Sequence, residues 1–336
     1  MAKITVLLSV HNGAEYLEAA IKSVLAQTLR DYEFLIIDDG STDRTPEIID
    51  SFLESRVRCI RHENNWGLIA SLNEGLAKAQ GKYVARMDAD DICDPRRLEL
   101  QVRLLDDKPA VGVVGSAVRL MDNKGRRGAV YLFPEHHDVI SWALAFLCPL
   151  AHPTVMMRRE VVVASGGYDA SALHAEDYDL WEKLSTVTRL ANLPLPLLNL
   201  RKHETSVTSR ETTRHTKTAI AVSARCMSRR LGYRVREEVS ACLMHGGRFD
   251  EETVWEAADV LSGLYTTFET DSPSDRDVVR MDAGLRMILL ALRVAKGAQR
   301  IALIKRAQSL DPWVWLRFLR RGVGRLTGIG EQRLVA

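Results

Sequence analysis

Asp88, Asp90 and Asp91 stand within four consecutive residues, directly after the apolar run 83–87. Carboxylates so close together repel one another once they leave water, and a bound divalent cation removes that conflict. Mg²⁺ and Mn²⁺ prefer carboxylate and phosphate oxygens to sulfur ligands. The cluster therefore predicts a metal site in which one carboxylate binds the ion while a neighbour holds a ribose hydroxyl. The alternative is an acidic turn that caps the helix expected after Pro95.

A second acidic pair, Asp38 and Asp39, follows the apolar residues 34–37 and precedes Gly40. A carboxylate fixed at a strand end, beside an apolar slot with Val10 as one wall, can accept the imide N–H of uracil or thymine. The same residues also suit an Asp-Gly turn followed by a helix cap. The pair alone leaves both interpretations open.

The elements that must position these clusters alternate between two hydrophobic periodicities. Strand patterns are expected at 4–10, 34–37, 57–60 and 83–87, and helical patterns at 14–28, 46–53, 67–79 and 95–107. This alternation predicts an α/β fold with a mainly parallel central sheet flanked by helices. Ligands of such sheets bind beyond the carboxyl ends of the strands. Residues 9–12, 38–41 and 88–91 all follow strand ends, so we expect them to share one crevice.

The later part of the chain predicts further elements and a boundary. We expect short strands within 111–133 with a hairpin turn near 122–125, a helix at 135–146, a strand at 155–157 and a helix at 177–185. After a polar run at 204–213 the pattern becomes helical. We therefore predict two domains: residues 1–210, which carry the site, and residues 211–336, a helical C-terminal region.

Composition favours a cytoplasmic globular protein. The hydrophobic share of 46% and the net charge of +2 are ordinary for soluble domains. The five cysteines show no C-x-x-C spacing, which argues against a zinc site or a disulfide framework. The chain opens without a signal-peptide pattern, and its longest apolar run, 139–151, is shorter than the roughly 20 residues of a membrane-spanning helix.

The C-terminal segment 313–321 mixes tryptophans with arginines. A helix of this kind can lie in a membrane interface and contact anionic headgroups, which would place the protein peripherally on the inner face of the cell membrane. It can equally pack its tryptophans onto the rest of the protein. The tail lacks a nucleic-acid-binding motif and its basic excess is modest, so no nucleic-acid partner is expected.

A series of short motifs, in order and spacing, resembles the inverting family 2 glycosyltransferases. The motifs are residues 9–12 (SVHN), 23–28 (SVLAQT), 36–43 (IIDDGSTD), 65–67 (NWG), 73–75 (NEG), 87–91 (MDADD), 152–154 (HPT), 166–169 (GGYD), 175–181 (AEDYDLW) and 201–203 (RKH). The likeness covers residues 3–210. It implies a GT-A fold, which is a Rossmann-like α/β architecture. It also implies a nucleotide-diphosphate sugar as donor, a sugar or lipid-linked sugar as acceptor, and Mg²⁺ or Mn²⁺ as cofactor.

The resemblance further implies roles for single residues. Those expected at the nucleotide are Ser9, Val10, Asn12, Asp39, Asn65 and Asp88. Those expected at the metal ion are Asp88, Asp90 and His203. Asp177 matches the general base, and Glu176 and Trp181 are expected near the acceptor. One departure from the family pattern is Leu72, which stands where many relatives carry an arginine.

This site predicts a single displacement at the anomeric carbon. Asp177 would take the proton of the acceptor hydroxyl as the new bond forms on the face opposite the leaving group, which inverts the centre. The metal ion would stabilise the departing nucleoside diphosphate. A UDP-sugar is the preferred donor because uridine is common in the family, with thymidine and guanosine left open.

The expected function is transfer of a single sugar in the synthesis of a cell-surface polysaccharide, lipopolysaccharide or glycoconjugate. The Gln-x-x-Arg-Trp motif and the membrane helices of processive polysaccharide synthases are absent. A sugar-nucleotide pyrophosphorylase would need a basic, Gly-rich loop after the first strand, and residues 9–15 hold neither lysine nor arginine. The alternative is a catalytically degenerate nucleotide-sugar-binding or scaffold protein, and Asp90 and Asp177 argue against it.

Overall fold

The computed structural model describes residues 2–52, 55–202, 212–245, 247–294 and 297–315. The chain divides into two compact units. The first runs to Glu135 and resumes from Leu150 to Thr212, and the second joins His136–Pro149 to the chain from Thr213 onward. The segment His136–Pro149 therefore belongs to the second unit, although it lies well before the boundary expected near residue 210.

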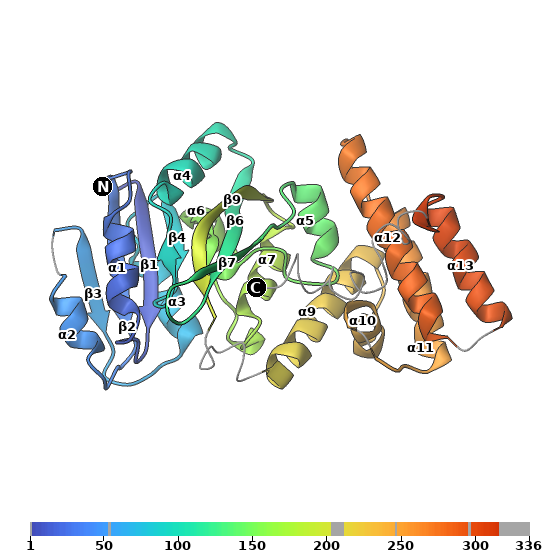
Figure 1. The fold of residues 1–336 in the computed structure, drawn as a ribbon, viewed down its shortest axis with the longest axis horizontal. Helices are drawn as coiled ribbons and strands as arrows, with labels where there is room; N and C mark the ends of the chain where they lie inside the picture. The colour runs from blue at the N-terminus through green and yellow to red at the C-terminus, as the bar shows by residue number, and fades with distance from the viewer. Residues whose placement is uncertain (1, 53–54, 203–211, 246, 295–296, 316–336) are drawn as a thin grey trace. The chain divides into compact units, whose positions relative to one another are not determined.

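The first unit is built on one sheet, whose N-terminal strands are parallel (Figure 1). These strands are β1 (Ile4–Val10), β2 (Tyr32–Asp38), β3 (Val57–Arg61) and β4 (Tyr83–Met87), in the spatial order β3-β2-β1-β4. The helices between them are α1 (Leu17–Leu25), α2 (Thr45–Asp50) and α3 (Leu68–Lys78). β1 and β2 are buried along nearly their whole length, as apolar runs in a parallel sheet predict. The predicted α/β architecture is confirmed.

Beyond β4 the sheet becomes mixed. The further strands are β8 (Met156–Arg158), β6 (Val111–Met121), β9 (Arg189–Arg201) and β5 (Ile92–Cys93) in that spatial order, while β7 (Arg127–Tyr131) pairs with β6. The predicted hairpin turn is confirmed, because the N–H of Gly125 donates to the carbonyl of Asp122 at 3.0 Å. The sequence does not predict β9, since Pro194 and Pro196 interrupt its pattern. Its pairing with β6 jumps from Leu193 to Pro196, and this irregularity accommodates the prolines.

The remaining helices of the first unit are α4 (Arg97–Asp107), α6 (Arg159–Ala164) and α7 (Glu176–Leu184). Close packing of α3 on β1 requires a glycine, because a Cβ on Gly75 would stand 2.3 Å from a methyl carbon of Leu7. Asn73, two residues earlier, exchanges two hydrogen bonds of 2.9 Å with the backbone of Tyr168. The Asn-Glu-Gly motif thus ties α3 both to the sheet and to the chain that leads into α7.

The second unit is helical, as predicted for the C-terminal region. Its helices are α5 (His137–Ala143), α9 (Thr212–Leu231), α10 (Glu237–Met244), α11 (Glu251–Thr266), α12 (Pro273–Arg293) and α13 (Ala298–Leu310). The segment around α5 is bonded to the later helices. The indole N–H of Trp142 donates to Asp282 at 2.7 Å, and the hydroxyl of Ser223 donates to the carbonyl of Ala145 at 2.7 Å.

In the described part of the chain, no helix combines the length and apolar character needed to cross a membrane. Trp313, at the start of the basic aromatic segment, is 59% exposed. Residues 316–321 of that segment lie outside the described residues. Its contact with a membrane stays a prediction.

Candidate active site

The three polar segments expected to share one crevice do meet at one edge of the sheet. β1 lies between β2 and β4 and is parallel to both, so Val10 pairs with Asp38 and Leu8 pairs with Met87. The N–H of Asp39 donates to the carbonyl of Val10 at 2.8 Å, one step beyond the paired residues. The strand register therefore confirms the predicted convergence.

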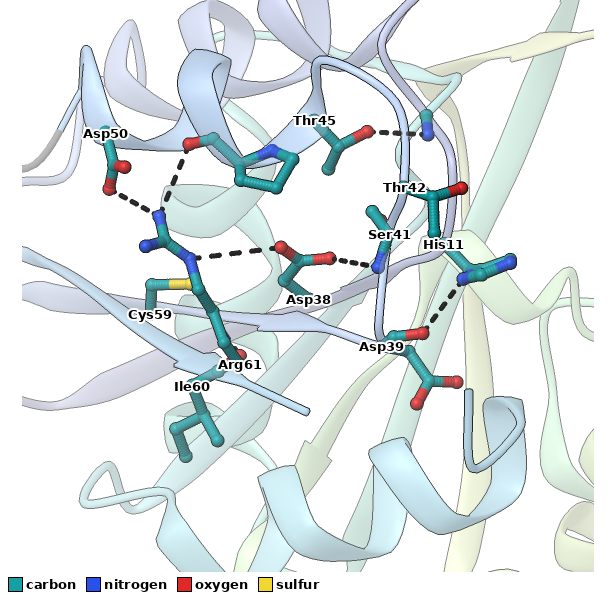
Figure 2. A network of polar contacts seen from close by, with 12 residues as sticks. His11, Asp38, Asp39, Ser41, Thr42, Thr45, Asp50, Cys59, Ile60 and Arg61 are labelled. Carbon is teal, nitrogen blue, oxygen red and sulfur yellow. Dashed lines mark hydrogen bonds and ion pairs between the residues drawn. The ribbon is translucent and has the colours of Figure 1, made fainter. Parts of the chain in front are cut away.

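Asp38 and Asp39 point in opposite directions, as Figure 2 shows. Asp38 accepts the N–H of Ser41 at 3.1 Å and lies 3.9 Å from Nε of Arg61, which also binds Asp50. Asp38 thus closes the turn after β2 and anchors it to β3. Asp39 faces the other way, toward the loop that carries His62, Trp66 and Gly67.

The carboxylate of Asp39 is surrounded by donors although only 2% of the residue is exposed. Its Oδ1 accepts from His62 Nδ1 at 2.7 Å and from the N–H of Trp66 at 2.8 Å, and its Oδ2 accepts from the N–H of Gly67 at 2.9 Å. Burial acts to raise the pKa of Asp39, but these hydrogen bonds outweigh it and hold the pKa below its ordinary value. The group is an ionised acceptor fixed in one orientation.

The loops around Asp39 are locked together by short polar contacts. Asn12, which has a positive φ of 53°, accepts the N–H of Thr42 on its side-chain oxygen at 2.8 Å and donates its own N–H to Ser41 at 2.9 Å. Gly40 also has a positive φ, and a Cβ there would lie 2.5 Å from the backbone of Asn64. Asn12 therefore holds the turn in place, and its predicted contact with the nucleotide stays a prediction.

The other residues predicted at the nucleotide stand around this turn. Ser9 is partly exposed and Val10 is buried at the end of β1. Asn65 is exposed, and its side-chain oxygen accepts the N–H of Gly67 at 2.9 Å. These residues border Asp39 without using its remaining acceptor capacity.

The acidic cluster lies at the end of β4. Ligand oxygens of Asp88, Asp90 and Asp91 all lie within 4.8 Å of one another. Asp91 is buried, and one of its oxygens accepts the N–H of Arg201 at 2.8 Å. Its other oxygen is buried without a hydrogen-bond partner among the described residues. Burial, reinforced by the charges of Asp90 and Asp88, raises the pKa of Asp91 well above its ordinary value. A buried acceptor of this kind fits a cation.

Arg86 supplies the countercharge beneath the cluster. It is buried on β4, and its Nη1 donates to Asp88 at 2.5 Å. Burial raises the pKa of Asp88, Arg86 opposes that rise, and the charges of Asp90 and Glu176 add to it. Leu72, the departure from the family pattern, is buried on α3. Arg86 is thus paired with Asp88.

The start of α7 brings further carboxylates to the same region. Asp177 is partly buried in the first turn, and its Oδ1 lies 2.7 Å from the N–H of Tyr178. Glu176 has a buried oxygen without a hydrogen-bond partner among the described residues, and burial together with Asp177 raises its pKa. Burial also raises the pKa of Tyr168, and the charges of Asp177, Glu176 and Asp88 contribute. Glu176 therefore lies close enough to Asp88 for their charges to interact, and Asp177 and Asp88 both act on Tyr168.

Trp181 and His152 belong to the core beneath this region. Trp181 has 0% exposed surface and packs edge-on against His152 at a centroid distance of 5.9 Å. Nε2 of His152 lies 2.8 Å from the hydroxyl of Tyr168, and burial followed by the charge of Arg86 lowers the pKa of His152 well below its ordinary value. The indole has no exposed surface in this structure. The predicted contact of Trp181 with the acceptor stays a prediction.

Two residues of the site, Arg201 and His62, were not predicted from the sequence. A third residue, His203, was predicted but is not among the described residues. Arg201 donates from Nε to the carbonyl of Asp90 at 2.8 Å, and its guanidinium lies 4.3 Å from the ring centroid of Tyr16. The one sequence feature that points to Arg201 is its position in the RKH motif at residues 201–203. His62 carries no motif of its own and is found only through its contact with Asp39. His203, a predicted metal ligand, lies outside the described residues.

Comparison with known proteins identifies the family. Residues 5–164 match the family model described as Glycosyl transferase family 2. An uncharacterized glycosyltransferase of Haemophilus influenzae is 32% identical over 221 residues, which are 61% of this chain and 67% of that protein. The O-antigen biosynthesis glycosyltransferase WbnJ of Escherichia coli is 33% identical over 211 residues, which are 60% of this chain and 81% of WbnJ.

Two solved structures share the fold. The crystal structure of S. aureus TarS 1-349 in complex with UDP-GlcNAc has a TM-score of 0.59 at 17% identity, over 94% of this chain and 92% of that chain. The mannosyltransferase PcManGT from Pyrobaculum calidifontis, in complex with GDP-Man and Mn²⁺, has a TM-score of 0.52 at 16% identity, over 94% of this chain and 84% of that chain. With a GT-A fold and relatives of this kind, the chain belongs to family 2 of the glycosyltransferases.

Proposed function

We propose that the chain transfers a single sugar from a nucleotide-diphosphate sugar to an acceptor hydroxyl, with inversion at the anomeric carbon. The observation that carries the proposal is the gathering of three acidic features around one edge of the sheet. They are the fixed acceptor Asp39, the cluster around Asp90 and the first-turn carboxylate of Asp177, whose charge acts on Tyr168 together with that of Asp88. WbnJ acts in O-antigen biosynthesis, which supports a role in cell-surface polysaccharide synthesis.

Asp39 supports recognition of a base that offers an N–H group. Its Oδ2 accepts one hydrogen bond among the described residues, so it has capacity for another donor. The imide N–H of uracil or thymine and the N1–H of guanine are such donors. TarS was solved with a UDP-sugar and PcManGT with a GDP-sugar, so both kinds of base occur on this fold. We favour a UDP-sugar, with Ser9, Val10 and Asn65 lining the nucleotide.

The acidic cluster fits a divalent cation, because one buried oxygen of Asp91 has no donor among the described residues, and because burial and repulsion raise the pKa of Asp91. Asp88 and Asp90 would hold Mg²⁺ or Mn²⁺, with Asp91 behind them and His203 as a further ligand. Oxygen ligands of this kind suit both ions. When bound, the ion supplies positive charge that stabilises the leaving nucleoside diphosphate.

The chain itself supplies proton transfer and orientation. An acceptor hydroxyl is a weak nucleophile at neutral pH, and Asp177 would take its proton as the new C–O bond forms. The positive end of the α7 dipole favours the ionised carboxylate that a base needs. Glu176, whose pKa is raised, retains its proton more readily and would donate a hydrogen bond at the acceptor side. A single displacement needs one base, whereas a retaining glycosidase needs a pair of carboxylates.

Thermal-shift measurements test the donor half of the proposal. UDP, dTDP and GDP would each be added with and without Mn²⁺, and one of them should raise the melting temperature by mass action only when the ion is present. Asp90→Ala should abolish that shift. Absence of a shift with every nucleotide would contradict the donor site and favour a scaffold protein, whereas a shift without sugar transfer would favour a degenerate nucleotide-sugar-binding protein.

Release of nucleoside diphosphate during sugar transfer tests the catalytic half. Asp177→Asn should keep the nucleotide-induced shift and lower transfer by about 10²–10⁴-fold, the range typical of general-base catalysis. Glu160→Gln, which removes an exposed carboxylate at α6, is the matched control and should transfer at the wild-type rate. Undiminished transfer by Asp177→Asn would remove Asp177 from the role of base.

A further inference from the structure

His62 links two carboxylates that lie on different elements. It follows β3 directly, and its side chain is 3% exposed. Its Nδ1 lies 2.7 Å from Oδ1 of Asp39, at the end of β2, and its Nε2 lies 2.6 Å from Oε2 of Glu74, on α3. Both carboxylates accept hydrogen bonds and neither donates when ionised. Only the imidazolium form of histidine carries a proton on both ring nitrogens, so this geometry fits a charged His62.

The surroundings of the ring favour the charged form. Burial acts to lower the pKa of His62, but the hydrogen bonds to Asp39 and Glu74 outweigh it and raise the pKa above its ordinary value. Those two carboxylates are the charged groups that the structure sets against the ring. Arg61 and Glu63 are its neighbours along the chain.

An aromatic ring covers one face of His62. The indole of Trp66 stacks on the imidazole with a centroid distance of 4.0 Å and an interplanar angle of 17°. A cation held against an aromatic face gains a favourable electrostatic interaction. Trp66 is itself 59% exposed, and its backbone N–H is one of the donors to Asp39. The charged ring thus fixes the loop that carries both Trp66 and the exposed Asn65.

The bridge also decides which oxygen of Asp39 remains available. His62 and the N–H of Trp66 both bind Oδ1, while Oδ2 receives the N–H of Gly67. If the link to His62 is broken, the carboxylate keeps only the backbone donors of Trp66 and Gly67, which belong to the loop that the imidazole also holds. A ligand N–H aimed at Oδ2 would then meet an acceptor that is held less firmly.

We propose that His62 is a positioning residue for the donor nucleotide: bridged to Glu74, it holds the carboxylate of Asp39 and the loop of Trp66 in the binding orientation, and it makes donor affinity depend on pH. This inference rests on the proposed function, because it concerns the same nucleotide site. His62 contacts two protein carboxylates and is not itself a catalytic residue.

The direction of the pH dependence follows from the sign of the shift. A histidine with a raised pKa contributes fully at low pH, and its contribution is lost as the pH rises through the raised pKa, above the ordinary value of about 6.5. Loss of the proton leaves one ring nitrogen as an acceptor facing a carboxylate. Donor affinity should therefore fall as the solution becomes alkaline.

Isothermal titration of the full chain with UDP, dTDP and GDP in Mn²⁺, from pH 6.0 to pH 8.5, tests the inference. The affinity of the nucleotide that binds should fall by about tenfold across this range, the equivalent of one hydrogen bond to a charged group. Glu74→Gln keeps a hydrogen-bond acceptor but removes one charge, so it should move the midpoint of the fall to lower pH. His62→Asn should bind more weakly at pH 6.0 and show little of the fall.

Glu63→Gln is the matched control, since it removes a charge from the exposed residue next to His62 and should leave the midpoint unchanged. Titration of the nucleotide itself is common to all variants and cancels in the comparison. The ¹⁵N resonances of the His62 ring, followed by NMR in the nucleotide-free chain, should titrate above the ordinary range in the wild type and at lower pH in Glu74→Gln.

The outcomes separate the two proposals. Nucleotide binding with the same midpoint in the wild type and Glu74→Gln overturns the role of His62 and leaves the proposed function intact. The same holds if the His62 ring titrates at its ordinary pKa. Failure of every nucleotide to bind at any pH overturns the proposed function and this inference together. A shifted midpoint in Glu74→Gln alone, with Glu63→Gln unchanged, supports the inference.

Discussion

Two groups of aspartates lie at one edge of the sheet and differ in what surrounds them. Asp39 receives three hydrogen bonds, and these lower its pKa. Asp91 instead lies beside Asp88 and Asp90, and one of its buried oxygens has no donor in the part of the chain that the structure describes. Burial and repulsion raise its pKa. The hydrogen bonds that fix Asp39 are present before any ligand binds, whereas the cluster of Asp88, Asp90 and Asp91 needs a cation to balance its charge. The comparison distinguishes a preformed recognition group from a site that depends on its ion.

The largest expected effect on stability comes from removing the charge of Asp39, whose hydrogen bonds are already in place. Asp39→Asn removes the charge that balances His62 and turns an amide nitrogen toward backbone donors. We expect the free energy of unfolding to fall by about 1.5–3 kcal/mol, the range for a hydrogen bond to a charged group. Chemical denaturation should show the same loss with Mn²⁺ and with EDTA. A loss that appears only when Mn²⁺ is present would contradict the comparison.

A smaller effect on stability, of opposite sign, is expected for a substitution of Asp91 in the acidic cluster. Asp91→Asn removes one of three mutually repelling carboxylates, so in EDTA the free energy of unfolding should rise by about 1–2 kcal/mol, the cost typical of an unsatisfied buried group. The stabilisation that Mn²⁺ gives to the wild type should shrink in the variant. Denaturation curves with and without the ion measure both. Destabilisation in EDTA would show that Asp91 is already satisfied.

The smallest effect is a difference in pH dependence, measured in EDTA between pH 3 and pH 8. Asp39 has a lowered pKa, so its contribution is present above its unfolded pKa of about 3.9 and is lost as the pH falls through the folded value. Asp91 has a raised pKa, so the penalty of its ionised form disappears on acidification. One proton changes stability by at most about 1.4 kcal/mol per pH unit. Stability differences between the wild type and the two asparagine variants should therefore slope in opposite directions, and parallel slopes would refute the contrast.

Much of the fold follows from local sequence patterns. Apolar runs that end in polar clusters predict both the parallel strands and the edge where the clusters meet, because strand direction alone brings their ends together. The same reasoning does not predict β9, because its irregular pairing with β6 is what accommodates Pro194 and Pro196. The burial of Trp181 could not be predicted from the sequence either, because an aromatic residue in an acidic motif suits a binding surface as well as a core.

The finer structure of the site depends on contacts between distant residues. His62 lies 23 residues from Asp39 and 12 residues from Glu74, and no local periodicity links them. The bridge forms only because α3 packs beside the end of β2. The assignment of His136–Pro149 to the helical unit has the same origin, since its partners stand far along the chain.

That assignment has a consequence for how the protein is made. Trp142 and its partner Asp282 are 140 residues apart. At a synthesis rate of about 5–20 residues per second, roughly 7–28 s separate their appearance at the ribosome. Within that interval the strands on either side of 136–149 are completed and can assemble, while Trp142 and Phe146 still lack the helices that cover them. The nascent chain thus carries an apolar segment in the middle of a folding unit, and such a segment is a target for chaperones during translation.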